Sequence, residues 1–213
     1  MHMNESGAAA DNADASQEAT TVAVRKRPKP GERRVQILQA LAAMLEQPGA
    51  ERVTTAALAA RLGVSEAALY RHFASKAQMF EGLIDFIEQS VFSLVNQIVG
   101  REQPVREKAV QIVRVLVQFA ESNPGMTRVM VGDALVFENE RLQQRMNLFF
   151  DKLESALRQV LREESASEAP TVDAQVRASA LTGWAMGQLQ RFARSGFRRM
   201  PSEHLDASLA LIV

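Results

Sequence analysis

The chain has 213 residues, of which 46% are hydrophobic, and it carries 25 basic and 25 acidic residues. This length is enough to bury a real core, and we expect two units, one small and one larger. The absence of cysteine excludes disulfides and thiolate metal sites, and it favours a reducing cytoplasm as the compartment. No apolar run approaches the ~20 residues of a membrane span, so no membrane partner is expected.

Positive charge is concentrated in one part of the chain. Residues 25–80 hold ten basic and four acidic side chains, whereas residues 1–24 hold four acidic side chains and no Lys or Arg. The polar composition of residues 1–24 predicts a disordered N-terminal extension. Residues 25–34 resemble a basic arm that follows a DNA backbone or lies in the minor groove, although a solvated linker is the alternative. Only Arg33 and Arg34 of this arm are expected to have a fixed place.

Residues 53–73 have the pattern of two short helices joined by a glycine turn. Thr54 is expected to cap the first helix and Ser65 the second, because their side-chain oxygens can accept from free backbone N–H groups. Gly63 stands between them, where a left-handed turn residue is needed. This pattern predicts a helix-turn-helix that reads DNA, and an ordinary helical hairpin is the alternative.

The second of these helices is predicted to enter the major groove. Leu69 and Phe73 are four residues apart and form its buried stripe, so the other positions face outward. Ala67 and Ala68 are small enough to let the helix approach closely, and either can touch a thymine methyl group.

Polar residues around this helix complete the predicted DNA contact. Ser65 or Arg71 can donate to base edges, whereas Tyr70, His72 and Lys76 can reach phosphates. The full predicted DNA-binding set is Arg33, Arg34, Thr54, Thr55, Ser65, Glu66, Ala67, Ala68, Tyr70, Arg71, His72 and Lys76.

The rest of the sequence predicts an all-α protein. Residues 25–80 are assigned to a three-helix DNA-binding domain, and residues 81–213 to a larger helical body for dimerisation and partner binding. Helices are expected at 32–47, 75–99, 104–122, 126–137, 138–164, 173–194 and from Pro201 onward. The long, apolar helix at 75–99 carries Leu94 among its apolar residues, and it must connect the small domain to the body.

Two glycines inside the helix at 173–194 point to a close helix contact. Glycine costs about 1 kcal/mol relative to alanine inside a helix, so Gly183 and Gly187 need a compensating interaction. With Ala180 and part of the helix at 138–164, they are predicted to form a homodimer interface of four helices, and packing within one chain is the alternative. A dimer would place two recognition helices on a palindromic operator.

The sequence offers no catalytic or cofactor signal. The three histidines are scattered, and the chain has neither a phosphate-binding glycine loop nor a nucleophile motif. We therefore expect no enzyme activity, no catalytic or metal-binding residues and no cofactor.

Residues 33–80 closely resemble the DNA-binding domain of TetR-type regulators. The likeness rests on Thr54-Thr55, Leu58-Ala59, Gly63-Val64-Ser65, Leu69-Tyr-Arg-His-Phe73, Ser75-Lys76 and Met79-Phe80. Within this family, further segments are similar to the nucleoid occlusion factors. These are Val64-Ser-Glu-Ala-Ala-Leu-Tyr-Arg-His-Phe73, Leu83-Ile-x-Phe-Ile-Glu88, Asn123-Pro-Gly-x-Thr-Arg128, Ala134-Leu-x-Phe-Glu138, Arg141-Leu-Gln143 and Leu157-Arg-Gln-Val-Leu-Arg-Glu163.

The resemblance implies a nucleoid-associated division inhibitor. Members of that subfamily bind specific chromosomal sites as dimers and also bind the tubulin-like protein FtsZ, whose polymers they disrupt so that no septum forms over DNA. Phe86 and Asn123 match the family's partner surface, near the junction of the long helix and the body. Leu94 and Ser122 depart from the basic residues that the resemblance would suggest, which puts a charge-based contact in doubt.

A ligand-responsive TetR-type repressor is the alternative. It would need a cavity in the body with a few polar groups among apolar walls, for which Gln111, Arg114 and Gln118 are possible lining residues. The bulky aliphatic residues of the segment 110–119 would instead fill such a cavity. A roomy pocket would favour the repressor, whereas a packed body with an exposed apolar groove at the helix 75–99 would favour the division inhibitor.

Overall fold

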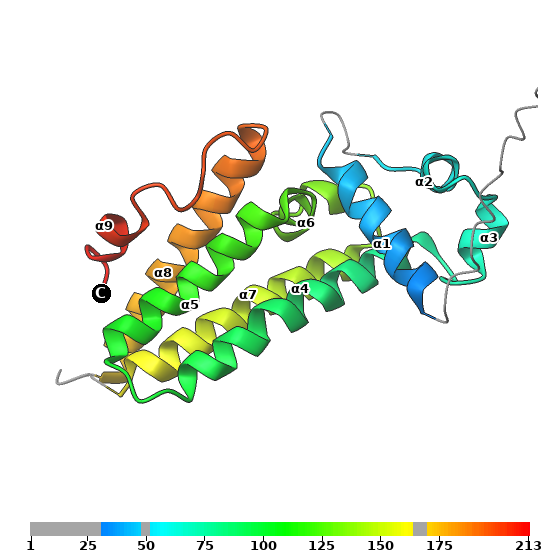
Figure 1. Ribbon diagram of the computed structural model, residues 1–213. Coiled ribbons are helices and arrows are strands. Elements are labelled where there is room, and N and C mark those ends of the chain that lie inside the picture. The colour runs from blue at the N-terminus through cyan, green and yellow to red at the C-terminus, as the bar shows by residue number, and fades with distance from the viewer. Residues whose placement is uncertain (1–30, 48–51, 164–169) are drawn as a thin grey trace, which may run out of the picture.

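The computed structural model describes residues 31–47, 52–163 and 170–213, and this part of the chain is helical without strands (Figure 1). The expectations for residues 1–24 and for most of the basic arm lie outside the described residues. The elements are α1 (Glu32–Leu45), α2 (Thr55–Leu62), α3 (Glu66–Tyr70), α4 (Lys76–Val99), α5 (Val105–Ser122), α6 (Pro124–Met130), a 3₁₀ turn η1 (Asp133–Leu135), α7 (Glu140–Leu161), α8 (Pro170–Arg194) and α9 (Leu205–Leu209). The predicted all-α class is confirmed.

The three N-terminal helices form a small unit at one end of the molecule, and α4 runs from this unit into a bundle with α5, α7 and α8 (Figure 1). Buried apolar side chains continue without interruption from α1 to α9. The helix α4 runs without a break across the predicted domain boundary at residue 80. Its side chains on both sides of that boundary are buried: Met79, Phe80, Leu83 and Ile84. The two units are therefore joined by one continuous helix and share a core.

Three predicted boundaries differ from the structure. The helix expected at 126–137 ends at Met130, because Gly132 adopts a left-handed φ of 86° and turns the chain into η1. The helix expected from residue 173 already begins at Pro170. The last helix begins at Leu205 rather than Pro201, because His204 has a positive φ of 57°. The first and the last of these shifts reflect the backbone at one residue rather than the apolar pattern.

Leu94 is one of the apolar residues of the long helix, but the structure does not bury it. Its side chain is 46% exposed, whereas Val91, Val95 and Ile98 on the same helix are buried. The buried stripe of α4 is therefore narrower than its apolar composition indicates, and one apolar side chain is left on the outer face.

Gly125 lets the body contact the DNA-binding unit closely. It is buried at the start of α6, which packs on α1. A Cβ atom at this position would overlap the carbonyl oxygen of Ala42 in α1. Since that oxygen belongs to the backbone of a helix, it cannot move aside cheaply, and the glycine is required for this contact.

Gly125→Ala is therefore expected to destabilise the fold by about 1–3 kcal/mol, the usual range for overpacking a core. Gly100→Ala is the matched control, because its new Cβ would lie 3.6 Å from the Asn96 carbonyl oxygen, an ordinary contact. Urea unfolding followed by circular dichroism measures both variants. Equal stability of the two variants would contradict the role of Gly125.

Candidate nucleic-acid interface

The structure forms the predicted helix-turn-helix from local hydrogen bonds. Thr54 Oγ1 accepts from the Ala57 N–H at 3.1 Å, and Ser65 Oγ accepts from the Ala68 N–H at 3.3 Å. Gly63 lies between the two helices with φ 65° and ψ 38°, in the left-handed region. Both predicted N-caps and the predicted glycine turn are confirmed.

The short helix α3 is anchored on one side and open on the other. Leu69 and Phe73 are each 1% exposed and join the core, as their spacing predicts. Tyr70 is 44% exposed, and Arg71 follows it as the C-cap residue of the helix. Five residues are exposed at or near the helix, namely Ser65, Glu66, Ala67, Tyr70 and Arg71, and two more, Ala68 and His72, are half-buried. This arrangement leaves a face of small and polar side chains that can enter a groove.

Several of the predicted DNA-binding residues have partners inside the protein. Thr55 Oγ1 donates to a carboxylate oxygen of Glu66 at 2.6 Å, which joins the first residues of α2 and α3. Arg34 donates from its guanidinium group to the His72 carbonyl oxygen, and the same group lies over the Phe73 ring, 4.1 Å from its centroid. Sequence reasoning did not foresee these contacts, since none of them follows from a local pattern.

Lys76 and Arg33 also make contacts within the chain. The ammonium group of Lys76 forms an ion pair with Glu138, and it lies 5.7 Å from the centroid of the Phe80 ring. Lys76 would have to leave Glu138 to contact a phosphate. Arg33 donates to Gln36 at 3.0 Å within its own helix, so its charge stays near the start of α1.

A series of ion pairs joins α4 to α7 in the body. Arg141 lies 2.8 Å from Glu81, and Arg145 donates to both Asp85 and Glu88. Burial lowers the pKa of Arg145, whereas the hydrogen bonds to Asp85 and Glu88 raise it, and the net shift is upward. These pairs hold the helix that carries the DNA-binding unit against α7.

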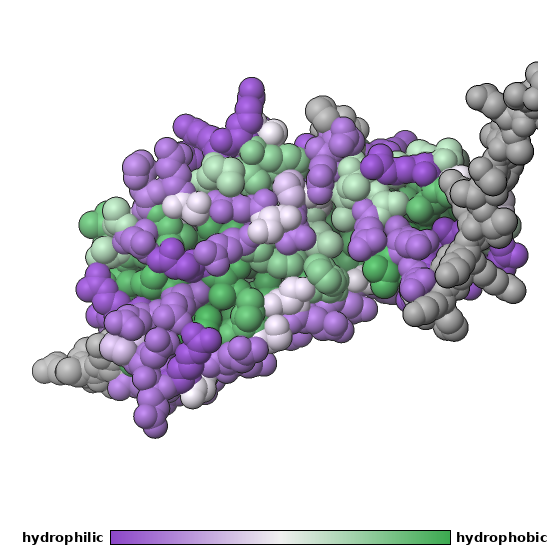
Figure 2. Space-filling model, in the orientation of Figure 1, coloured by the Kyte–Doolittle hydropathy of each residue, from purple (hydrophilic) through white to green (hydrophobic). Residues whose placement is uncertain are grey.

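The outer face of α4 and α5 carries exposed apolar side chains. Phe86 is 47% exposed, so it is not a plain core residue. Its ring lies 6.2 Å from that of Phe119 on α5, and Asn123 donates from its side-chain amide to the Phe119 carbonyl oxygen at 2.8 Å. With Leu94 these residues form what we call the α4–α5 surface. Figure 2 shows apolar surface where α4 and α5 run side by side.

The predicted dimer residues lie on an open face of α8. Ala180, Gly183 and Gly187 are all exposed, and a Cβ atom added at either glycine would meet no atom within 4 Å. The alternative that these glycines serve packing within one chain is therefore wrong. Large apolar side chains are also exposed on α7 and α8: Leu148, Val172, Val176 and Met186.

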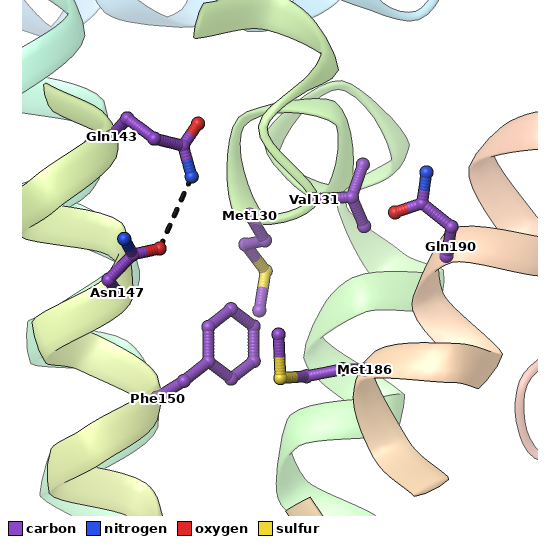
Figure 3. Close-up of a pocket in the computed structure, with 7 residues that line it drawn as sticks. All are labelled: Met130, Val131, Gln143, Asn147, Phe150, Met186 and Gln190. Carbon is purple, nitrogen blue, oxygen red and sulfur yellow. Dashed lines mark hydrogen bonds between the residues drawn. The ribbon is translucent and has the colours of Figure 1, made fainter. Parts of the chain in front are cut away.

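The body contains a small hollow between α6, α7 and α8 (Figure 3). Its volume is about 80 Å³, whereas pockets for drug-sized ligands usually measure ~300–1,000 Å³. Its lining residues are Met130, Val131, Gln143, Asn147, Phe150, Met186 and Gln190. A molecule of that size does not fit this hollow.

Two of the three residues proposed to line a ligand cavity, Gln111 and Arg114, line a second hollow of about 340 Å³, which is open to solvent along α5. Arg114 pairs with Asp206 on α9, Gln111 accepts from Arg101 at 3.4 Å, and Gln118 is exposed. None of the three lines the hollow between α6, α7 and α8. The aliphatic face of α5 is instead buried within the bundle, as its bulky side chains suggest: Ile112, Val113, Leu116 and Val117.

Two further features are absent from the described ranges. None of the helices there combines the length and the apolar character needed to cross a bilayer. No three His, Asp or Glu side chains of these ranges come together as a possible metal site.

Two family models match the chain. Residues 37–83 match the model of bacterial regulatory proteins of the tetR family, which covers the helix-turn-helix. Residues 101–213 match the SlmA-like model of the tetracyclin repressor-like C-terminal domain.

Solved structures share the fold at low sequence identity. A TetR-like transcriptional regulator from Rhodococcus sp. RHA1 has a TM-score of 0.69 at 19% identity and covers 87% of this chain and 97% of its own. The regulator FadR from Bacillus subtilis, solved with stearoyl-CoA, has a TM-score of 0.65 at 14% identity, with 84% and 97% covered.

Curated relatives are far more similar in sequence. The nucleoid occlusion factor SlmA of Vibrio vulnificus strain YJ016 is 50% identical over 187 residues, which cover 86% of this chain and 95% of the relative. The protein of the same name from Idiomarina loihiensis is 51% identical over 177 residues, which cover 82% and 90%. The chain therefore belongs to the SlmA family of nucleoid occlusion factors, within the TetR-type DNA-binding regulators.

Proposed function

We propose that this protein is a DNA-bound inhibitor of cell division that acts on FtsZ. As a homodimer it binds a palindromic chromosomal site, associates with the nucleoid, and disrupts FtsZ polymers so that no septum forms there. The observation that carries this proposal is the α4–α5 surface, where exposed Phe86 lies beside Phe119 on the body that also carries the helix-turn-helix. The name of the curated relatives supports the same function.

DNA binding is assigned to the exposed face of α3. Ala67 and Ala68 let the helix approach the base edges, and Arg71 and Ser65 supply donors at its two ends. Tyr70 is placed to reach the backbone, where contacts fix the position of the helix but carry no sequence information. One such helix of five residues reads few bases, so two copies are needed for a specific site.

Dimerisation is assigned to the open face of α7 and α8. The exposed glycines of α8 let a second helix approach closely, and Leu148 and Val176 supply apolar area beside them. Pairing this face with its copy would form the predicted four-helix arrangement. Because the contact is symmetric, each residue of the face is buried twice.

Gly187→Leu is expected to give monomers and to abolish operator binding, since the new side chain fills the space that the second helix needs. Gln97→Leu on α4 is the matched control, because it adds the same side chain at another exposed position. Light scattering gives the oligomeric state, and fluorescence anisotropy gives the DNA affinity. A Gly187→Leu protein that stays dimeric would refute this interface.

The alternative of a ligand-responsive repressor has less support. Its ligand would need a larger cavity than the hollow of about 80 Å³ between α6, α7 and α8, and the wider hollow at Gln111 and Arg114 is open to solvent along α5 rather than enclosed by the bundle. The position of Arg114 in an ion pair with α9 agrees with a solvent-facing role for this side of α5.

The α4–α5 surface is proposed as the FtsZ-binding site. The rings of Phe86 and Phe119 lie 6.2 Å apart, and Leu94 is a further exposed apolar side chain on α4. Burying one phenylalanine side chain contributes about 1.5–3 kcal/mol, so a few such residues can dominate a modest interface. Asn123 holds the end of α5 next to Phe119 through its bond to the backbone, so its role is to shape the surface.

Phe86→Ser is expected to weaken the effect on FtsZ by about tenfold or more while leaving DNA affinity unchanged, given the apolar area lost. Phe137→Ser is the matched control, because that phenylalanine is 66% exposed on a different part of the body. Sedimentation of GTP-assembled FtsZ polymers, with and without operator DNA, measures the effect. If the wild-type protein leaves the polymers intact, or if both variants behave alike, the proposed function or its surface is wrong.

A further inference from the structure

The recognition helix α3 depends on its surroundings for its orientation. It has only five residues, Glu66–Tyr70. Isolated helices of this length are not stable in water, because the conformational entropy lost in forming the first turn exceeds the stabilisation from its few hydrogen bonds. Buried Leu69 and Phe73 hold the helix down on the core, but an apolar contact does not set its direction sharply. Polar contacts at the two ends of the helix are therefore the features that can fix it.

At the N-terminal end, α3 is tied to α2 by a side-chain hydrogen bond. Thr55 Oγ1 donates to Glu66 at 2.6 Å, and each residue is the first of its helix. A carboxylate at this position is favoured by the helix dipole. The bond keeps that carboxylate beside α2 and links the starts of the two helices at a fixed separation.

At the C-terminal end, α3 is tied to α1 by Arg34. The carbonyl oxygens of the last turn of a helix have no partner within the helix. Arg34 donates to the carbonyl oxygen of His72, just beyond the C-cap residue Arg71, while its guanidinium plane lies 4.1 Å from the centroid of the Phe73 ring. This combination needs a planar group that donates and stacks at once, which arginine provides and lysine does not.

We propose that Arg34 and the Thr55–Glu66 pair are positioning residues that brace the recognition helix at its two ends. They set how well the protein distinguishes its operator from other DNA, rather than its general affinity for DNA. Base readout depends on a geometry held within about 0.5 Å, whereas phosphate contacts tolerate more movement. This assignment rests on the proposed DNA binding. It changes the role of Arg34, Thr55 and Glu66, which the sequence pattern predicts to contact DNA directly.

Arg34→Lys is the decisive variant, because it keeps the positive charge but removes the planar guanidinium group that donates to His72 and lies over the Phe73 ring. The full-length protein would be titrated with a selected operator and with a random duplex of equal length, at several salt concentrations. We expect affinity for the random duplex and its salt dependence to stay as in the wild type, and the preference for the operator to fall about tenfold. If Arg34→Lys keeps the full preference for the operator over the random duplex, the positioning role of Arg34 is wrong.

Arg33→Ala is the matched control, because its guanidinium group bonds within α1 to Gln36. If Arg33 contacts a phosphate, its loss weakens binding to both duplexes by a similar factor and lowers the salt slope by about one. If an Arg34→Ala protein loses affinity for both duplexes by a similar factor, Arg34 is a phosphate contact and its proposed positioning role is wrong.

A double-mutant cycle tests the other end of the helix. If Thr55 and Glu66 act as a pair, Thr55→Val and Glu66→Ala lower the operator preference by the same factor, and the double variant loses no more than either single one. Effects that multiply would show two independent DNA contacts and would refute the pair. A wild-type protein without operator preference would contradict the proposed function itself, which separates that failure from a failure of the brace. Thermal unfolding of each variant confirms that the fold is retained.

Discussion

The buried stripe of α4 is the feature on which the rest of the molecule depends. This helix begins at the DNA-binding unit and ends deep in the body, and its inward side chains are buried along its whole length. Its charged residues pair with α7, which carries part of the proposed dimer face. A rotation or shift of α4 would therefore disturb the core and these ion pairs together. The position of each recognition helix is coupled in this way to the proposed dimer face.

The three proposed binding surfaces occupy separate parts of one helical framework. The recognition face lies on α3 at one end, the α4–α5 surface lies along the outer side of the bundle, and the exposed glycines lie on α8 (Figure 1). No described side chain belongs to two of these sets. DNA, a second copy and a partner protein can therefore bind at the same time, which a DNA-bound inhibitor of division requires.

Local patterns predicted the fold and part of the site. Thr54, Gly63 and Ser65 act on backbone groups within a few residues of themselves, so their roles could be inferred from spacing. Partners that lie far apart in sequence could not be inferred in this way. Arg34 bonds to a residue 38 positions away, and Lys76 to one 62 positions away. Both residues were assigned to DNA because an arginine or lysine near a helix-turn-helix carries the expected charge, whatever its partner.

Leu94 shows the limit of apolar patterning on a long helix. An apolar residue beside a buried stripe is consistent with either a core position or an exposed contact surface, and only the packing of α5 and α7 decides which.

The central claim is that two recognition helices are held at one fixed separation, and selection of bound duplexes from a random library tests it most directly. The account predicts two inverted half-sites at a single spacing near one helical turn, about 34–36 Å. Enrichment of single half-sites, or of half-sites at many spacings, would contradict it.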